Sequence, residues 1–247
     1  TANAVNTFCN AIDAASLRSK MVRVNLMAGT GLNAVLVPLY RGTSLTGTQL
    51  GNATDTNVNF VSGDYTEGSG LNSSANKYLL TGLDQTYADN KHAGAFAYTL
   101  SGGVFRTMVG MGDANTPGVG DTGRFSVGSS SSATVPRAGV SPTVASDQSF
   151  AIGTAMANGD FVLGSSAASG ANQLRIFVNG SSQGTATARD NSFSTGEFAI
   201  FALRRESDGA ISELFNGRLG GYTIGLNLTD GEVATYSTIW DTFLKAL

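Results

Sequence analysis

The acidic residues of this sequence are the first candidates for chemistry, because glycoside hydrolysis requires two carboxylates about 5–10 Å apart. Glu206, Asp208 and Glu213 come nearest to such a pair. Asp208 precedes a glycine, and an Asp-Gly pair is typical of a tight hairpin turn. A solvated turn therefore explains these carboxylates better than a catalytic pair, and a glycoside hydrolase is the least favoured function.

Nucleophilic catalysis requires a base held beside a serine or cysteine. His92 is the only histidine, and it lies in a polar stretch between two expected strands, where a lone histidine is usually solvated. Residues 180–184 match the Gly-x-Ser-x-Gly motif by their letters. They lie in an expected hairpin turn, however, and not in the strand-to-helix turn that exposes a nucleophile. We identify no catalytic residue and expect a protein that is not an enzyme.

A calcium site is the metal site that the composition leaves open. The single cysteine, Cys9, and the single histidine exclude a site of the zinc type. Calcium requires only oxygen ligands, and Asp55, Asp113 and Asp121 are the candidate ligands in loop-like segments. Their spacing is not rigid, so surface carboxylates without a metal are the alternative.

Aromatic side chains beside polar loop residues are common in carbohydrate-binding sites. Tyr65 and Tyr87 lie in loop-like segments, close in sequence to Asp64 and Asn90 respectively. This pairing is compatible with a shallow glycan site, although ordinary solvated loops also show it by chance. Tyr98 is a further aromatic residue that we expect to be exposed.

The composition indicates a globular chain with little charge. The 247 residues carry a formal net charge of -3, with 13% charged and 41% hydrophobic residues. A chain of this kind buries enough apolar surface to fold and lacks the high net charge typical of disorder. Its few basic residues are scattered, which argues against nucleic acid as a partner. Its apolar runs are shorter than the ~18 residues that a membrane helix needs, so we expect no membrane insertion.

The N-terminal apolar spacing predicts a helix between Val5 and Leu17. Apolar and polar residues then alternate over Met21–Leu26, which predicts a half-buried strand. Val35–Tyr40 is a second apolar run, and its internal Pro38 limits it to a strand end or an edge strand.

Most of the remaining chain indicates short strands separated by glycine-rich turns. Asn158-Gly159 and Asn179-Gly180 supply the positive φ angles of a tight hairpin. The first pair predicts a hairpin between residues 149–155 and 160–165. The second predicts one between residues 173–178 and a strand near 186–189. This pattern predicts a mainly β fold, with two antiparallel sheets in a sandwich.

The last segment predicts an amphipathic helix that closes the sandwich. Thr229 and Glu232 fit a capping box, in which each side chain bonds to the backbone of the other residue. Five apolar residues then recur at helical spacing and build one face of the helix: Val233, Tyr236, Trp240, Phe243 and Leu247. We expect this face to be buried, with Trp240 in the core.

The domain organisation is simple. We expect residues 1–40 to form an N-terminal helix and strand segment that serves as an adaptor, and residues 41–247 to form the sandwich. One continuous domain over residues 1–247 is the alternative.

Three segments, in this order, resemble the laminin-G-like branch of the concanavalin A-like lectin/glucanase superfamily: Lys77–Leu83, Arg175–Gly180 and Asn216–Glu232. The resemblance covers roughly residues 70–247. It implies a concanavalin A-like jelly roll of two curved antiparallel sheets. The preceding segment Leu36–Gly42 looks like segments found before such domains in bacteriophage and other virion-associated proteins.

These observations favour a non-enzymatic structural or adhesion protein of a virion, such as a phage tail, fibre or capsid-decorating protein. Its partners would be other virion proteins or cell-surface glycans. It would form a homo-oligomer, as such proteins usually do, and it would be found in a virion or in the extracellular space. The alternative is a carbohydrate-binding module of a bacterial secreted or surface protein.

Overall fold

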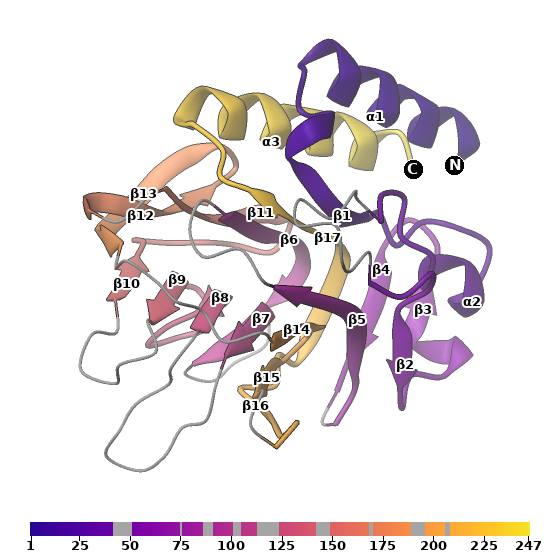
Figure 1. The fold of residues 1–247 in the computed structure, drawn as a ribbon. Helices are drawn as coiled ribbons and strands as arrows, with labels where there is room; N and C mark the ends of the chain where they lie inside the picture. Colours follow the sequence, from indigo (N-terminus) through magenta and orange to yellow (C-terminus); the bar gives the residue numbers. More distant parts are fainter. Residues whose placement is uncertain are drawn as a thin grey trace.

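A computed structural model shows a β-sandwich with helices packed on one side (Figure 1). The structure describes residues 1–41, 51–74, 76–85, 91–100, 105–112, 124–141, 149–167, 170–188, 196–205 and 208–247. The expected mainly β fold, with an N-terminal and a C-terminal helix, is confirmed.

The sheet on the helix side contains eight strands in the described part of the chain. Its order is β13-β12-β11-β6-β17-β4-β3, and β1 also pairs with β17. The strands are β1 Met21–Asn25, β3 Tyr65–Thr66, β4 Gly70–Ser73, β6 Lys91–Leu100, β11 Asp160–Ser166, β12 Gly170–Val178, β13 Ser181–Ala188 and β17 Gly217–Leu226. Every pairing recorded in this sheet is antiparallel.

The opposite sheet has the order β10-β9-β8-β7-β14-β5-β2; in addition, β15 pairs with β7, and β16 pairs with β15. Its strands are β2 Thr56–Val58, β5 Tyr78–Gln85, β7 Arg106–Gly112, β8 Arg124–Ser129, β9 Pro136–Ser141, β10 Ser149–Ile152, β14 Gly196–Ile200, β15 Leu203–Arg205 and β16 Ile211–Ser212. β15 runs parallel to β7, whereas the other recorded pairs are antiparallel.

The strand period of two divides the residues of the helix-side sheet between two apolar layers. Val162 of β11 belongs to the layer between the sheets, where it packs with apolar residues of both sheets. Its neighbours Phe161 and Leu163 belong to the layer between this sheet and the helices. Successive side chains of a strand point to opposite faces, so one strand contributes to both cores.

The helices α1 Ala2–Ala14 and α3 Asp230–Lys245 cover the outer face of this sheet (Figure 1). Phe8 of α1 lies with its ring centroid 5.4 Å from that of Trp240, in an edge-to-face contact. Trp240 is fully buried, as expected, and the Thr229–Glu232 capping box is present. No helix in the described ranges has the length and apolar character needed to cross a membrane.

The hairpin turn at Asn179-Gly180 forms as predicted, but its second strand, β13, begins at Ser181, directly after the turn, and not near residue 186. Asn179 and Gly180 have φ angles of 48° and 80°, which are the left-handed values that the turn requires. The hairpin predicted around Asn158-Gly159 does not form, because β10 pairs with β9 and β11 pairs with β6 and β12. Of that pair only Gly159 has a positive φ, and the Asn158 side chain instead accepts a hydrogen bond from the Leu100 amide. The chain therefore crosses here from one sheet to the other.

The N-terminal segment differs from its prediction in two respects. All five residues of β1 are buried, including the polar ones, because this strand lies between the helices and the interior of the sandwich. The run Val35–Tyr40 is not a strand: Leu32–Val35 forms the short helix α2, and Tyr40 makes an isolated bridge to Val24. The division of the chain at residue 40 stays a prediction, although β1 hydrogen-bonds to β17.

Two short 3-10 helices complete the described elements, η1 Arg18–Lys20 and η2 Ser62–Asp64.

Candidate functional site

Asp64 and Tyr65, the two described residues of the predicted sugar site, form hydrogen bonds with other residues of the protein. Asp64 accepts hydrogen bonds from the Lys77 ammonium at 2.6 Å and from the Val61 amide at 2.7 Å. The half-buried Tyr65 donates its hydroxyl to the Gly29 carbonyl at 2.6 Å. Tyr87 and Asn90 lie outside the described residues. A glycan site at these four residues stays a prediction.

Asp55 lies inside the sandwich, in a buried polar network. Its carboxylate accepts hydrogen bonds from Arg23, Asn25 and Tyr222, at 2.7, 2.8 and 2.7 Å. Burial raises the pKa of this carboxyl, although the Arg23 guanidinium opposes the shift. Asp113 and Asp121 lie outside the described residues, and the described ones contain no group of three metal-binding side chains of His, Cys, Asp or Glu type. Calcium binding stays a prediction.

Glu213 is not part of a solvated turn, contrary to expectation. Arg124 and Arg137 both donate to its carboxylate, at 2.5 and 2.7 Å, and so does the Thr107 hydroxyl at 2.6 Å. Burial by itself raises the pKa of a carboxyl, but here the guanidinium groups, Arg124 first, lower the pKa to about 2. A carboxylate so firmly ionised is held by its cations and is poorly suited to donate a proton.

The hairpin turn at Asp208-Gly209 is confirmed, because β15 and β16 pair on either side of it. Asp208 is half exposed and pairs with Arg205 at 2.5 Å. Glu206 lies outside the described residues. Asp208 and Glu213 therefore have separate arginine partners.

His92 is a fully buried residue of β6 and not a loop residue. One ring nitrogen, Nδ1, faces the Leu226 carbonyl, and Nε2 lies 2.9 Å from the Thr223 hydroxyl. Burial lowers its pKa to about 4. The prediction of a solvated histidine was wrong because the surrounding strand is built from small and polar residues, Lys91 to Ala95, which resemble a loop in sequence.

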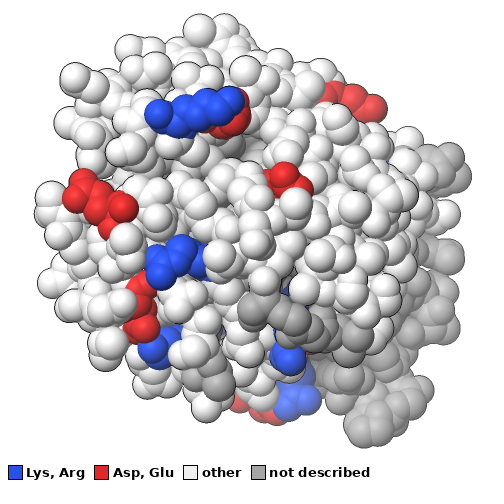
Figure 2. All heavy atoms as spheres, turned by 180° about the vertical axis from the view of Figure 1, so that it is seen from behind, with Lys and Arg blue, Asp and Glu red and all other residues white. Residues whose placement is uncertain are grey.

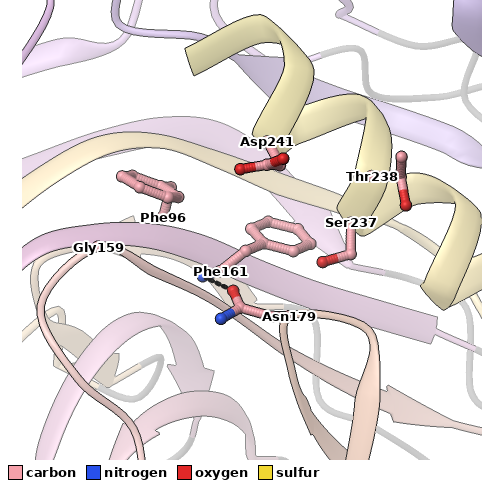
Figure 3. A pocket seen from close by; sticks show the side chains of 7 residues that line it. All are labelled: Phe96, Gly159, Phe161, Asn179, Ser237, Thr238 and Asp241. Atoms are coloured by element: carbon pink, nitrogen blue, oxygen red, sulfur yellow. Dashed lines mark hydrogen bonds between the residues drawn. The ribbon is translucent and has the colours of Figure 1, made fainter. Parts of the chain in front are cut away.

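A pocket of about 270 Å³ lies between α3 and the outer face of the helix-side sheet (Figure 3). We call it the α3 pocket. Seven described residues line it: Phe96, Gly159, Phe161, Asn179, Ser237, Thr238 and Asp241. They come from β6, from the turn before β11, from β11 itself, from the β12–β13 turn and from α3.

Aromatic rings form the floor of the α3 pocket. Phe161 stacks on Trp240 with a centroid distance of 5.3 Å and meets Tyr236 edge-on at 5.7 Å. Phe96 packs edge-on against the half-buried Tyr98 at 4.7 Å. These ring contacts fix the two phenylalanines, so the apolar floor is in place before any ligand arrives.

The β12–β13 turn fixes the polar wall of the α3 pocket. The Asn179 side chain accepts from the Phe161 amide at 2.9 Å (Figure 3). It also donates to Asp160 at 2.7 Å. Gly180, next in the turn, lies under α3, where an added Cβ would come within 2.9 Å of the Ala234 Cα atom. A glycine here therefore lets the helix approach closely enough to bring Ser237 beside Asn179.

Ser237 and Asp241 project from α3 toward the two phenylalanines (Figure 3). Ser237 is buried, with 6% of its surface exposed, whereas the Asp241 side chain is 59% exposed and forms an ion pair with Lys245. Chemically, the pocket therefore combines an apolar ring surface with an amide, hydroxyls and a carboxylate.

No motif in the sequence predicted the α3 pocket. Its lining residues come from four segments that are far apart in the chain, and none of them belongs to a motif of binding residues. One signal was present: the polar Ser237 and Asp241 each lie next to an aromatic residue of the apolar helix face, Tyr236 and Trp240. Polar residues beside a buried helix face mark the edge of that face. A pocket forms along this edge where side chains of the sheet do not fill the space.

Comparison with known proteins extends the description of the fold. No protein-family model and no curated protein sequence matches this chain. Domain 4 of AbnA, an extracellular GH43 arabinanase of Geobacillus stearothermophilus solved with arabinotriose, is similar over 87% of this chain and 99% of that domain, with 14% identity and a TM-score of 0.51. A mutant of HCR/D is similar over 90% of this chain and 53% of its own, with 10% identity and a TM-score of 0.57.

A third solved structure is similar over a smaller part of the chain. The CBM40 domain of the Ruminococcus gnavus IT-sialidase, bound to α2,3 sialyllactose, matches 60% of this chain and 83% of its own, with 15% identity and a TM-score of 0.45. At these identities the likeness concerns the fold alone, and it is consistent with the lectin-like jelly roll expected from the sequence.

Proposed function

We propose that this protein binds a carbohydrate, and that the α3 pocket is the binding site. The observation that carries the proposal is the combination, in one preformed pocket, of two fixed phenylalanines with an amide, a hydroxyl and a carboxylate. A sugar ring presents a face of C–H groups and an edge of hydroxyl groups. The C–H face packs on the negative face of an aromatic ring, and the hydroxyls donate to the oxygen atoms of the wall.

The size of the α3 pocket suits a small part of a glycan. Its volume of about 270 Å³ lies just below the range for ligand sites, which begins at about 300 Å³. We therefore expect it to hold one terminal sugar. AbnA domain 4, which shares the fold and was solved with arabinotriose, supports the carbohydrate class.

Binding without catalysis is the activity proposed here. The virion role expected from the sequence, its virion partners and its homo-oligomeric state stay predictions, as do the virion or extracellular location and the absence of enzymatic activity. Glycan binding is also the form of adhesion that both sequence hypotheses share.

A blocked pocket tests the proposal. Ser237→Met places a longer side chain in the pocket and should abolish binding on a glycan array on which the unaltered protein binds. Thr235→Met is the matched control, because Thr235 is an exposed threonine two residues before Ser237, on the other side of α3, and does not line the pocket. Both variants should keep the fluorescence of the buried Trp240, which reports that α3 is still in place.

Two results would contradict the proposal. The first is a protein that binds no glycan on the array, with or without calcium. The second is glycan binding that Ser237→Met and Thr235→Met leave equally strong, which would move the site away from the α3 pocket.

A further inference from the structure

The charge of the α3 pocket points to a class of sugar. We propose that the pocket takes a neutral sugar, and that Asp241 binds a hydroxyl group of this sugar and disfavours acidic sugars. This inference rests on the proposed function. It concerns which glycans bind, whereas the proposed function states only that a glycan binds.

Asp241 is the charged residue among the described lining residues. Its Oδ2 accepts a hydrogen bond from the Lys245 ammonium at 2.6 Å. Each carboxylate oxygen can accept two hydrogen bonds, so the carboxylate keeps the capacity to bind a ligand hydroxyl while Lys245 stays in place. Its side chain is 59% exposed, which leaves it accessible from outside.

A second carboxylate, that of Asp160, contacts the Asn179 side chain but does not line the pocket. Asp160 accepts from the Asn179 side chain at 2.7 Å and from the Ala157 amide at 2.6 Å. Its role is to hold Asn179 in the wall, and it adds a negative charge behind that residue. The described lining residues include no lysine or arginine, and Lys245, which pairs with Asp241, lies outside the lining.

These charges act in opposite directions on neutral and acidic sugars. A hydroxyl donated to an ionised carboxylate makes a hydrogen bond about twice as strong as one between neutral groups. The carboxylate of an acidic sugar, in contrast, would lose water in a pocket whose described lining offers it no cation and would lie near Asp241. The pocket chemistry therefore favours uncharged sugars.

Lactose and sialyllactose are suitable probes, together with arabinotriose, because sialyllactose adds one acidic sugar to lactose. Titration calorimetry should show that the neutral glycan that binds best, lactose or arabinotriose, has an affinity at least about tenfold above that of sialyllactose. Asp241→Asn keeps the shape of the side chain and removes its charge. This variant should bind the neutral glycan about tenfold more weakly, since a hydrogen bond to a charged group contributes on the order of 1.5 kcal/mol. It should also narrow the difference in affinity between the neutral and the acidic glycan.

Asp208→Asn is the control for this experiment. Asp208 is an exposed aspartate of similar accessibility, paired with Arg205, and it does not line the α3 pocket. This variant should bind both glycans as the unaltered protein does. A merely structural effect of Asp241→Asn would weaken both glycans alike and leave their ratio unchanged, which would overturn the inference.

The failure of this inference can be distinguished from the failure of the proposed function. Tight binding of sialyllactose that Ser237→Met abolishes would overturn the inference and leave the α3 pocket as a glycan site. Binding of no glycan at all would overturn both. If Asp241→Asn leaves the binding of neutral glycans unchanged, Asp241 does not contact the glycan and the inference is wrong.

Discussion

Acid should destabilise this protein through its single histidine. His92 is fully buried in β6, with its ring at 6.2 Å from that of Tyr236 in α3. A carbonyl can only accept a hydrogen bond, so Nδ1 carries the proton that is donated to Leu226; burial disfavours a second proton on the ring, so Nε2 accepts from the Thr223 hydroxyl. The folded protein therefore holds His92 as a neutral ring.

The size of the effect follows from the pKa of His92. Burial lowers this pKa from its ordinary value of 6.5 to about 4 in the folded protein, with a smaller contribution in the same direction from Lys20. Between pH 6.5 and pH 4 the unfolded chain binds a proton that the folded protein does not, so stability falls as the pH falls through this window. Since each pH unit between the two values corresponds to about 1.4 kcal/mol, the free energy of unfolding should drop by about 3 kcal/mol.

Urea denaturation at several pH values between 7 and 4 measures this drop, with the fluorescence of the single Trp240 as the probe. His92→Asn is the comparison variant, because its amide keeps a donor near the Nδ1 position and does not titrate. Carboxylates such as Glu213 titrate alike in both proteins and cancel in the difference. The stability difference between the two proteins should therefore shrink by about 3 kcal/mol from pH 7 to pH 4. Parallel stability curves would refute the buried, neutral histidine.

Two further substitutions test the cores on either side of the helix-side sheet. Trp240→Ala should destabilise the protein by about 3–5 kcal/mol, because it removes a fully buried ring that stacks on Phe161; circular dichroism measures the melting temperature, and an unchanged value would show that this helix face is exposed. Asp55→Asn should cost about 3–5 kcal/mol in urea denaturation, because it leaves the buried Arg23 guanidinium without its anion. Replacing both, as Arg23→Met with Asp55→Leu, should recover much of that loss, and a double variant as unstable as Asp55→Asn would argue against this reason.

Local chemistry made the C-terminal helix and the β12–β13 hairpin predictable. A capping box and an Asn-Gly turn satisfy their backbone groups within a few residues, so a short segment of sequence is enough to predict them. The burial of Trp240 followed in the same way, because the helical period fixes which residues share a face.

Tertiary contacts determine the structure of the segments that we predicted incorrectly from the sequence. Arg23 and Asn25 alternate with apolar residues as surface residues do, yet both are buried, because Asp55 and Tyr222 supply their hydrogen bonds. Asp55 and Tyr222 lie about 30 and 200 residues further along the chain, so no local sequence pattern predicts these hydrogen bonds. The sequence predicts only the later part of β6 as a strand, and residues 91–94 resemble a loop for a related reason: the buried Ala93 is too small to mark a strand by hydrophobicity.

The α3 pocket also depends on both local sequence patterns and tertiary packing. The strand period places Phe96 and Phe161 on the outer face of the helix-side sheet, and the helical period places Ser237 and Asp241 on one side of α3. What joins them is the position of α3 over the β12–β13 turn, where Gly180 permits a close approach. The helix that closes the core therefore also forms one wall of the pocket, so the residues that hold α3 in place, Trp240 first, also maintain the geometry of the proposed sugar site.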